Sequence, residues 1–494
     1  MGQDPNDILR NDGAAALRRQ FDTSARIVRL PQGNDLPALK IGSDQDIAAQ
    51  VRILLESIHG KMVADSGILY AWNQRFWGEI GQSDVYAVIK RFDGAALPEG
   101  RCRTVRLSKS KLQSIEHLLY RLCEVPGFFD APAKGIPCRN GFIVIDDEAA
   151  CLKPHDPDHR NRYVLAGDWT GELLTEPPEG SELRRLITGC FRDDPEADLK
   201  KALLQEIAGG ALIGATRSLA SPKAIILLGE RAGNGKSQLI DMFRGLVPSH
   251  AIAALSPAQF SDERLVVALF GKVLNMADEI GDRAIGSERF KAVVTGEPIT
   301  GRAVFKDGLT FRSQALHVFS ANRLPAFRDG MDRGVRRRLI VLRCDRVIPE
   351  ADRVPGIGRI VADFELHLLL AWAVQGALSL LRRGHFDEPP SSRDALNDWA
   401  RISDSMTEWL GDDDGLTVSG NTSDRVRIEA VYECYRSWCV SMRIKDTGIL
   451  DRPKFVRRIK AGEFDGLSFI RKANSKEVAG LWINHSRVAP VSGK

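Results

Sequence analysis

The sequence contains no run of about 18 apolar residues, the length that a helix needs to cross a membrane. It also contains no internal repeat and no low-complexity tract. Its first residues, MGQDPNDILRNDG, do not show the basic and then apolar order of a secretory signal. These absences exclude a membrane span and a repeat array, and they predict a cytoplasmic protein that makes no membrane contact.

Paired cysteines of the zinc-binding kind are absent as well. The chain has 8 cysteines, but none forms a C-x-x-C pair and none clusters with histidines at zinc-binding spacing. Scattered thiols are typical of proteins in a reducing compartment. The sequence therefore predicts neither a structural zinc site nor a disulfide framework.

Net charge is small, because 69 basic residues face 65 acidic ones, which leaves +4. The distribution is uneven, since residues 452–494 hold ten basic and three acidic side chains. This tail carries +7 and the residues before it carry −3. A basic terminal module on a near-neutral body favours contact with nucleic acid, although a merely solubilising basic face would have the same composition.

The stretch LLGERAGNGKSQLI, residues 227–240, has the features of a phosphate-binding loop. A short apolar strand at 224–229 leads into it, and a helix from about 236 to 246 is expected to follow. The pattern G-x-x-x-x-G-K-[ST] expects glycine at position 230, but Glu230 stands there and the glycine comes one residue earlier. Because the last positions of such a loop hold the phosphates, we expect the extra residue to be tolerated. The predicted ATP-binding residues are Gly233, Asn234, Gly235, Lys236, Ser237 and Gln238.

Two further apolar runs, 273–277 and 315–321, end in polar residues. The first leads into Asp278 and Glu279, and the second leads into Asn322. Short buried strands separated by helical segments indicate an α/β sheet with its site along the carboxyl edge of the strands.

The spacing of these residues predicts their chemical roles in ATP hydrolysis. Lys236 would neutralise phosphate charge, while Ser237 and Asp278 would hold Mg²⁺. Glu279 would polarise the attacking water. Asn322 would orient that water or sense the γ-phosphate, unless it only caps a turn.

An arginine cluster, DRGVRRRL at residues 332–339, follows the third apolar run. Arg337 and Arg338 are candidates for an arginine finger that completes the site of a neighbouring subunit. A solvated basic loop or a contact with the DNA backbone is the alternative, and the sequence does not choose between the two arginines.

A β-hairpin is predicted for ITGRAVFKDGLTF, residues 299–311, around the turn Lys306-Asp307-Gly308. Arg302, Phe305 and Lys306 would lie on this hairpin or at its tip. A basic residue beside an aromatic one could grip single-stranded DNA, whereas a hairpin that only packs is the alternative.

The chain is expected to be α/β, with several regions in series. A helix beginning at Asp46 and a strand pair around Asn140-Gly141 open the N-terminal domain, and a helical stretch from Ser181 to about Thr216 opens the P-loop domain. Helices at 425–443 and 452–460, followed by strands LSFIRKA and AGLWINH, predict a C-terminal winged helix that binds DNA or a partner protein. The predicted regions are a flexible arm (1–45), a mixed α+β domain (46–180), the P-loop domain (181–410), a linker (411–424) and the C-terminal module (425–494).

These motifs together resemble those of the superfamily III helicases, within the AAA+ ATPases, and more narrowly the phage/plasmid primase-helicase family, which includes the poxvirus primase-helicase. GNGKS matches its Walker A motif, VLNMADE its Walker B motif, HVFSANRLP its motif C and GVRRRL its G-x-x-R-R-L motif. The resemblance extends over about residues 50 to 490. It implies an AAA+ core with a parallel sheet, a hexameric ring, ATP at subunit interfaces, 3′-to-5′ movement and DNA contact by Lys306.

The sequence therefore predicts an ATP-dependent DNA helicase that acts on single-stranded and forked DNA during replication of a phage, satellite, plasmid or other mobile element. With only about 45 residues before the helicase-type region, it is expected to lack a primase domain and to work beside a separate primase or initiator. An AAA+ origin-binding initiator or remodeller that melts or loads without processive unwinding would share every ATPase residue. A degenerate ATPase scaffold conflicts with the intact motifs, and a small-molecule kinase leaves the hairpin unexplained.

Overall fold

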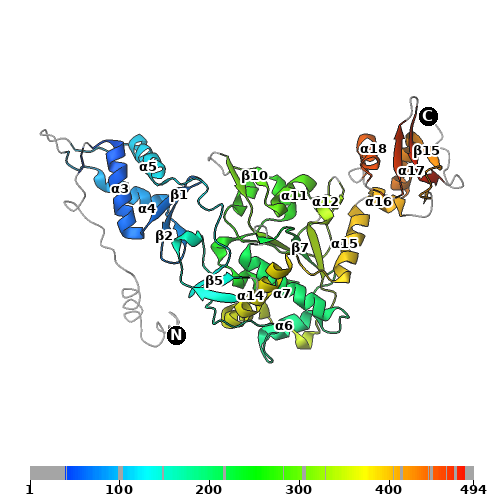
Figure 1. The fold of residues 1–494 in the computed structure, drawn as a ribbon, viewed down its shortest axis with the longest axis horizontal. Helices are drawn as coiled ribbons and strands as arrows, with labels where there is room; N and C mark the ends of the chain where they lie inside the picture. The colour runs from blue at the N-terminus through cyan, green and yellow to red at the C-terminus, as the bar shows by residue number, and fades with distance from the viewer. Residues whose placement is uncertain are drawn as a thin grey trace. The chain divides into compact units, whose positions relative to one another are not determined.

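Figure 1 shows the fold of the chain in a computed structural model. The structure describes residues 39–40, 42–97, 104–146, 149–214, 218–281, 283–302, 308–328, 330–403, 405–411, 416–442, 444, 449–462, 464, 466–471 and 475–483. The predicted flexible arm, 1–45, lies outside these residues except for 39–40 and 42–45.

The chain divides into two compact units, which differ from the predicted domains. They are Met1–Ala133 with His155–Arg162, and Lys134–Pro154 with Tyr163–Lys494. The predicted N-terminal domain, 46–180, is thus split between them. The reason is burial, because Ile136, Ile143 and Trp169 belong to the core of the second unit.

The first unit combines helices with a three-stranded antiparallel sheet in the order β1-β2-β3. Its elements are α3 (Asp44–His59), β1 (Met62–Asp65), β2 (Ile68–Trp72), β3 (Trp77–Glu79), α4 (Gln82–Ile89), α5 (Lys109–Cys123) and the 3-10 turns Lys90–Phe92 and Pro157–His159. The predicted first helix is confirmed as α3, where the Ser43 side chain accepts from the backbone N–H of Asp46 and caps the helix. The indole of Trp77 donates to the carbonyl O of Pro157 at 2.9 Å, which ties the returning segment to the sheet.

A five-stranded parallel sheet forms the centre of the second unit, in the order β13-β7-β12-β9-β8. Its strands are β7 (Ala224–Leu228), β8 (Ile252–Ala253), β9 (Leu274–Ala277), β12 (Leu316–Ala321) and β13 (Leu339–Arg343). Numbered along the chain within this sheet, the order is 5-1-4-3-2. The three strands predicted from apolar runs are confirmed as β7, β9 and β12, whereas β13 was missed although LIVLR is equally apolar.

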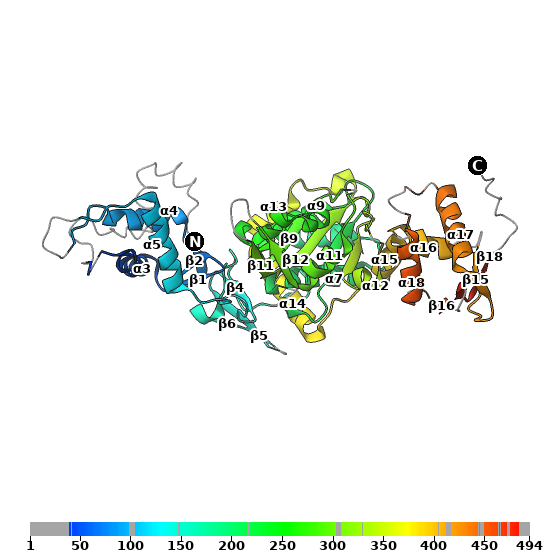
Figure 2. The same ribbon diagram turned by 90° about the horizontal axis from the view of Figure 1, so that it is seen from above.

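Helices cover both faces of this sheet. Ile225 and Leu227 of β7 pack on one face, and Ala224 and Ile226 pack on the other, as the two-residue period of a strand requires. The first face carries α6 (Glu182–Phe191), α7 (Ala197–Ile213), α9 (Lys236–Leu246), α13 (Ile357–Phe364) and α14 (Leu366–Arg383). The second carries α10 (Glu263–Val266), α11 (Ser287–Thr295), α12 (Arg333–Arg336) and α15 (Pro390–Ser403), and it also includes the 3-10 turn Pro257–Ser261. The pairs α7 with α14 and α9 with α13 lie side by side (Figures 1 and 2).

The long helix predicted from Ser181 to about Thr216 is two helices, α6 and α7. It breaks between Phe191 and Ala197, where Asp193 has a φ of 66° and Pro195 cannot continue a helix. Among the described residues, no single helix is both long enough and apolar enough to span a membrane, although one bent pair, Glu350–Phe364 and Leu366–Arg383, passes on length and composition.

Two small antiparallel sheets flank the central one, and the strand pairing of both predicted hairpins is confirmed. Their strands are β4 (Ile136–Cys138), β5 (Gly141–Ile145) and β6 (Ala150–Lys153) in one, and β10 (Pro298–Gly301) and β11 (Leu309–Arg312) in the other. In the second hairpin Thr300 pairs with Thr310, and Ile299 and Phe311 turn inward into the core. The turn predicted at residues 306–308 lies outside the described residues except for Gly308.

The C-terminal residues have a hydrophobic core of their own, in which Trp409, Tyr435 and Phe455 are buried together. The elements are α16 (Ser405–Leu410), β14 (Leu416–Val418), β15 (Arg425–Arg427), α17 (Ile428–Ser441), α18 (Arg452–Lys460), β16 (Ser468–Arg471), β17 (Lys476–Ala479) and β18 (Leu481–Ile483). Strands β15, β17 and β16 form one antiparallel sheet in that order, and β14 pairs with β18.

Several boundaries in this region differ from the predicted ones. The predicted linker contains strand β14, and α16, assigned to the P-loop domain, contributes Met406 and Trp409 to the C-terminal core. Residues 425–427 are a strand rather than the start of a helix. The segment AGLWINH is not the second hairpin strand, because Gly480 has a φ of 92° and redirects the chain, so β18 pairs with β14.

Candidate nucleotide-binding site

The loop between β7 and α9 has the geometry of a phosphate cradle. Gly233 and Gly235 have φ values of 77° and 85°, in the left-handed region that favours glycine. The side-chain amide of Asn234 donates to the carbonyl O of Arg231 at 2.8 Å, which closes the loop on itself. Helix α9 begins directly after the loop, so its unpaired backbone N–H groups face the cradle.

The extra residue lies in the outer part of this loop. Gly229 continues β7, because its N–H donates to the carbonyl O of Ala321 at 3.1 Å on the neighbouring strand. Glu230 and Arg231 are exposed, while the Gly233–Ser237 core reaches the start of α9 as a P-loop does. The additional residue therefore lies in the exposed outer part of the loop, before the Gly233–Ser237 core.

The side chain of Lys236 turns back into the loop. Its Nζ donates to the carbonyl O of Gly229 at 2.7 Å and to Oδ1 of Asn234 at 3.0 Å. Lys236 is only 5% exposed, and this burial lowers the pKa of its ammonium group below the ordinary value, an effect that Cys344, Asp278 and Glu279 oppose. The lysine is thus held inside the cradle and faces the acidic pair.

The acidic pair follows β9 at the same edge of the sheet. Ser320 on β12 donates its hydroxyl to Oδ1 of Asp278, and the backbone N–H of Glu279 donates to Oγ of Ser320 at 2.9 Å. Glu279 has a φ of 49°, which is uncommon for a residue other than glycine. Both carboxylates are exposed at this edge, where a cavity of about 280 Å³ adjoins them.

Asn322 lies at this edge as well. It follows Ala321, which pairs with Leu228, so it stands level with Gly229 at the start of the loop. Its side chain is exposed. The structure therefore brings Lys236, Ser237, the acidic pair and Asn322 to the carboxyl edge of three adjacent strands.

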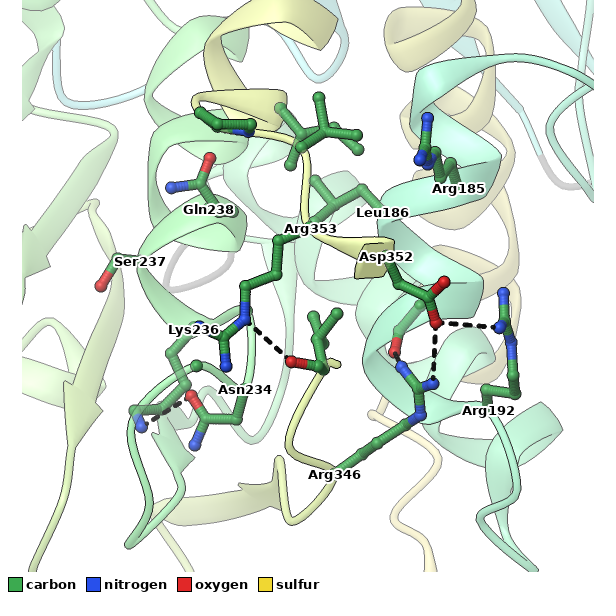
Figure 3. A pocket seen from close by; sticks show the side chains of 17 residues that line it. Arg185, Leu186, Arg192, Asn234, Lys236, Ser237, Gln238, Arg346, Asp352 and Arg353 are labelled. Carbon is green, nitrogen blue, oxygen red and sulfur yellow. Dashed lines mark hydrogen bonds and ion pairs between the residues drawn. The ribbon is translucent and has the colours of Figure 1, made fainter. Parts of the chain in front are cut away.

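A cavity of about 480 Å³ opens on the other side of the loop, against α6 and the segment after β13 (Figure 3). Gly233–Gln238 line it, as predicted for nucleotide ligands. The side-chain Oε1 of Gln238 also accepts from the N–H of Gly358 at 3.1 Å, which joins α9 to α13. The cavity has an apolar wall of Leu186, Ile348, Val354, Pro355 and Ile357.

Four arginines at this cavity were not predicted: Arg185, Arg192, Arg346 and Arg353. Arg353 lies over the loop, where its Nη2 would be 2.4 Å from a Cβ placed on Gly233. Its Nε donates to the carbonyl O of Ile348 at 2.8 Å, and Ile348 in turn donates to the carbonyl O of Gly233 at 2.8 Å. The sequence holds no local signal for this contact, because 120 residues separate Arg353 from Gly233.

The carboxylate of Asp352 stands between two of these arginines. Its Oδ2 lies 3.4 Å from Nη1 of Arg192 and 3.7 Å from Nη2 of Arg346 (Figure 3). Arg346 also donates to the carbonyl O of Gly189 on α6 at 2.6 Å. These contacts fix the segment after β13 against α6 and shape the wall of the cavity.

The loop and the acidic pair have side chains suited to a nucleoside triphosphate with a magnesium ion. Among the described residues no group of three or more histidine, cysteine, aspartate or glutamate side chains could hold a metal alone. Mg²⁺ usually takes one or two protein ligands and completes its shell with water and phosphate oxygens. The exposed hydroxyl of Ser237 and carboxylate of Asp278 are donors of that kind.

Two protein-family models match parts of the chain. Residues 52–207 match the family described as D5 N terminal like, and residues 227–338 match a family of unknown function, DUF5906. Both kinds of domain are found in phage/plasmid primase-helicase-like proteins. The matches indicate a protein of phage or plasmid replication.

Three solved structures of the NrS-1 C-terminal region are similar to the chain. The A form apo structure is 11% identical with a TM-score of 0.45 and covers 87% of this chain and 98% of that one. The apo structure of residues 305–718 is 12% identical with a TM-score of 0.46, and the match covers 87% of this chain and 98% of that one. The A form apo structure of residues 305–718 is 12% identical with a TM-score of 0.46, and the match covers 87% of this chain and 99% of that one. Comparison with curated protein sequences gives no significant match.

The candidate finger arginines lie far from the loop of their own chain. Arg338 immediately precedes Leu339, which pairs with Ala224 at the start of β7, whereas the loop follows the end of β7. At about 3.3 Å per residue, that separation along the strand is roughly 15 Å. Arg337 is exposed, but Arg338 is 9% exposed and donates to the carbonyl O of Gly334 at 2.8 Å.

The predicted DNA-binding residues of the hairpin are only partly described. Phe305 and Lys306 lie outside the described residues. Arg302 is exposed, and its backbone N–H donates to the carbonyl O of Glu263 at 2.9 Å. Arg289 of α11 donates to the carbonyl O of Thr300 at 2.7 Å, which fixes the base of the hairpin to the helix before it.

Proposed function

We propose that this chain is an ATP-dependent DNA helicase of the superfamily III type, with an AAA+ core, that acts in replication of a phage, plasmid or other mobile element. The observation that supports this most is the common edge of a 5-1-4-3-2 sheet that holds Lys236, Asp278, Glu279 and Asn322. The family matches agree with a replication role.

The loop residues bind and orient the triphosphate. The backbone N–H groups of residues 233–237 surround the phosphates, and Lys236 exchanges its two loop contacts for phosphate oxygens. Arg353, above Gly233, adds a second positive charge from the same chain. The nucleoside lies against the apolar wall of the 480 Å³ cavity.

Glu279 accepts a proton from the attacking water as general base, and Asn322 orients that water through its amide. Ser237 and Asp278 would hold Mg²⁺, which would supply positive charge to offset the negative charge that develops during hydrolysis.

A neighbouring subunit completes this site. Because Arg337 is exposed at the opposite edge of the sheet, it serves the nucleotide of the next subunit rather than its own. This arrangement requires a ring, for which a hexamer is the proposed state. The hairpin of β10 and β11, with Arg302, Phe305 and Lys306, contacts the DNA strand that passes through the ring.

The C-terminal module is proposed to be a winged helix. Its order along the chain is α16, β14, β15, α17, α18, β16, β17 and β18. Two helices followed by the paired strands β16 and β17, with β17 between β15 and β16 in the sheet, support this assignment. Arg457 on α18 is exposed on a helix rich in basic residues, which favours contact with duplex DNA.

That basic helix also supports the alternative, an AAA+ initiator or remodeller that melts or loads at an origin without processive unwinding. Strand separation on forked and 3′-tailed duplexes distinguishes the two. A helicase opens them with ATP, Lys236→Ala abolishes hydrolysis and unwinding, and Lys306→Ala retains basal hydrolysis but stops unwinding. Lys153→Ala, which removes an exposed lysine on β6, is the matched control. Hydrolysis without opening of any tailed duplex would favour the initiator.

A further inference from the structure

Ser320 makes three hydrogen bonds to the turn at residues 278–280, which carries the acidic pair, although no role was predicted for it from the sequence. Its hydroxyl donates to Oδ1 of Asp278 and accepts from the backbone N–H of Glu279 at 2.9 Å. Its carbonyl O accepts from the backbone N–H of Ile280 at 2.9 Å. Ser320 is completely buried on β12, one residue beyond Phe319, which pairs with Ala277.

The conformation of Glu279 depends on these bonds. Its φ of 49° lies in the left-handed region, which is disfavoured for a residue with a Cβ and persists only where its surroundings hold it. Two hydrogen bonds from its N–H, to Ser320 and to Oδ1 of Asp278 at 3.1 Å, supply that restraint. Without the Ser320 hydroxyl, the turn could relax to an extended or right-handed conformation, and the glutamate would point elsewhere.

We propose that Ser320 is the positioning residue of this site: it orients the carboxylates of Asp278 and Glu279 for magnesium binding and water activation. This inference rests on the proposed ATPase function and assigns a role within it. The hydroxyl occupies Oδ1 of Asp278, so Oδ2 would be the oxygen free to interact with a cation. The bond to the Glu279 N–H sets the direction of the general base.

The test compares Ser320→Ala with Ser320→Thr, which keeps the hydroxyl, and with Ser313→Ala. Ser313 is the matched control, because it is 2% exposed and its hydroxyl has no partner in the described part of the chain. Steady-state ATP hydrolysis gives kcat and KM. The thermal stabilisation of each variant by ATP, with and without magnesium, gives a readout that does not need turnover.

Ser320→Ala is expected to lower kcat roughly 10-fold to 100-fold while KM for ATP changes little, as for other residues that orient a metal ligand or base. The magnesium requirement should shift to higher concentration. Ser320→Thr should recover most of the rate, and Ser313→Ala should match the native protein in every readout. Equal kcat and equal magnesium dependence in native protein and Ser320→Ala would overturn the inference.

A double-mutant cycle separates positioning from a general loss of stability. If Ser320 acts through Glu279, adding Ser320→Ala to Glu279→Gln should cost almost no further activity. Full additivity of the two losses would instead show that Ser320 does not act through Glu279 and would contradict that part of the proposal. If the native protein neither binds nor hydrolyses ATP, the proposed function and this inference are overturned together. If the native protein is active and Ser320→Ala has the same kcat and magnesium dependence, the inference alone is overturned.

Discussion

The guanidinium group of Arg353 lies directly over the backbone of Gly233. A Cβ on Gly233 would be 2.4 Å from Nη2 of Arg353, closer than a Cβ approaches another heavy atom. The contact joins the phosphate loop to the segment after β13, which also lines the cavity proposed for the nucleoside.

Gly233→Ala should weaken ATP binding by roughly tenfold or more, because the new methyl group displaces Arg353 and the φ of 77° strains any other residue. Titration with a fluorescent ATP analogue measures the effect. Gly384→Ala is the control, since Gly384 has a φ of 76° with nothing within 4 Å of an added Cβ. Equal ATP affinity in the two variants would mean that crowding against Arg353 has no role.

Arg353→Ala should raise KM for ATP roughly 10-fold to 150-fold and leave kcat nearly unchanged, because a charge-assisted hydrogen bond contributes about 1.5–3 kcal/mol to binding. Arg359→Ala should have little effect, since the Arg359 side chain is 78% exposed and its ion pair with Asp241 is 3.6 Å long. A loss confined to kcat in Arg353→Ala would place this arginine at the transition state instead of the bound triphosphate.

Under the proposed trans arrangement, in which Arg337 serves the neighbouring subunit, Arg337→Ala should abolish hydrolysis without reducing ATP binding. Mixing it with Lys236→Ala protein should restore part of the activity, since some interfaces then pair an intact loop with an intact finger. Arg338→Ala should instead lower the melting temperature, because the side chain is buried and bonded to Gly334. Failure of every mixture to recover activity would count against a finger that acts in trans.

Acid should destabilise the protein through His317. Burial lowers the pKa of His317 to about 4, while an unfolded histidine titrates near 6.5. Between these values the unfolded chain binds more protons, so stability falls as pH falls. The contribution to the loss between pH 7 and pH 5 is about 2 kcal/mol. Urea unfolding of the native protein and His317→Gln at both pH values measures it.

His317→Gln should lose less stability between pH 7 and pH 5 than the native protein does. The glutamine does not titrate, and its amide can replace the 3.1 Å contact of Nδ1 with the buried amide of Asn275. His367→Gln, at an exposed histidine on α14, should keep the native pH dependence. The same pH dependence in all three proteins would show that another group causes the acid sensitivity.

Local sequence patterns predicted much of the candidate site. The apolar runs gave β7, β9 and β12 within one residue at each end, and the predicted P-loop helix is α9. The pairing of β10 with β11 was also predicted, because the residues on either side of the expected turn alternate. These features depend on neighbouring residues, so their signal is contained in short segments of the chain.

Boundaries that depend on long-range packing were not predicted. The strand β14 and the pairing of β18 reflect contacts with distant segments. The split of residues 134–162 between two units has the same origin. Ile136 is buried in the core of the second unit, whereas Pro157 accepts a hydrogen bond from Trp77, which is buried in the first. The break between α6 and α7 has a local cause instead, because Pro195 lies between the two helices, and the sequence prediction overlooked it.

By itself, the sequence determined which residues are chemically suited to bind and hydrolyse a nucleotide, because residue type and spacing define the loop, the acidic pair and the polar end of β12. Only the tertiary structure decided that Ser320 restrains the acidic pair and that Arg353 covers Gly233. It also separated the exposed Arg337 from the buried Arg338. These contacts join strands and loops that are 41 to 120 residues apart, and the parallel sheet brings them together through non-local pairing that a local pattern does not encode.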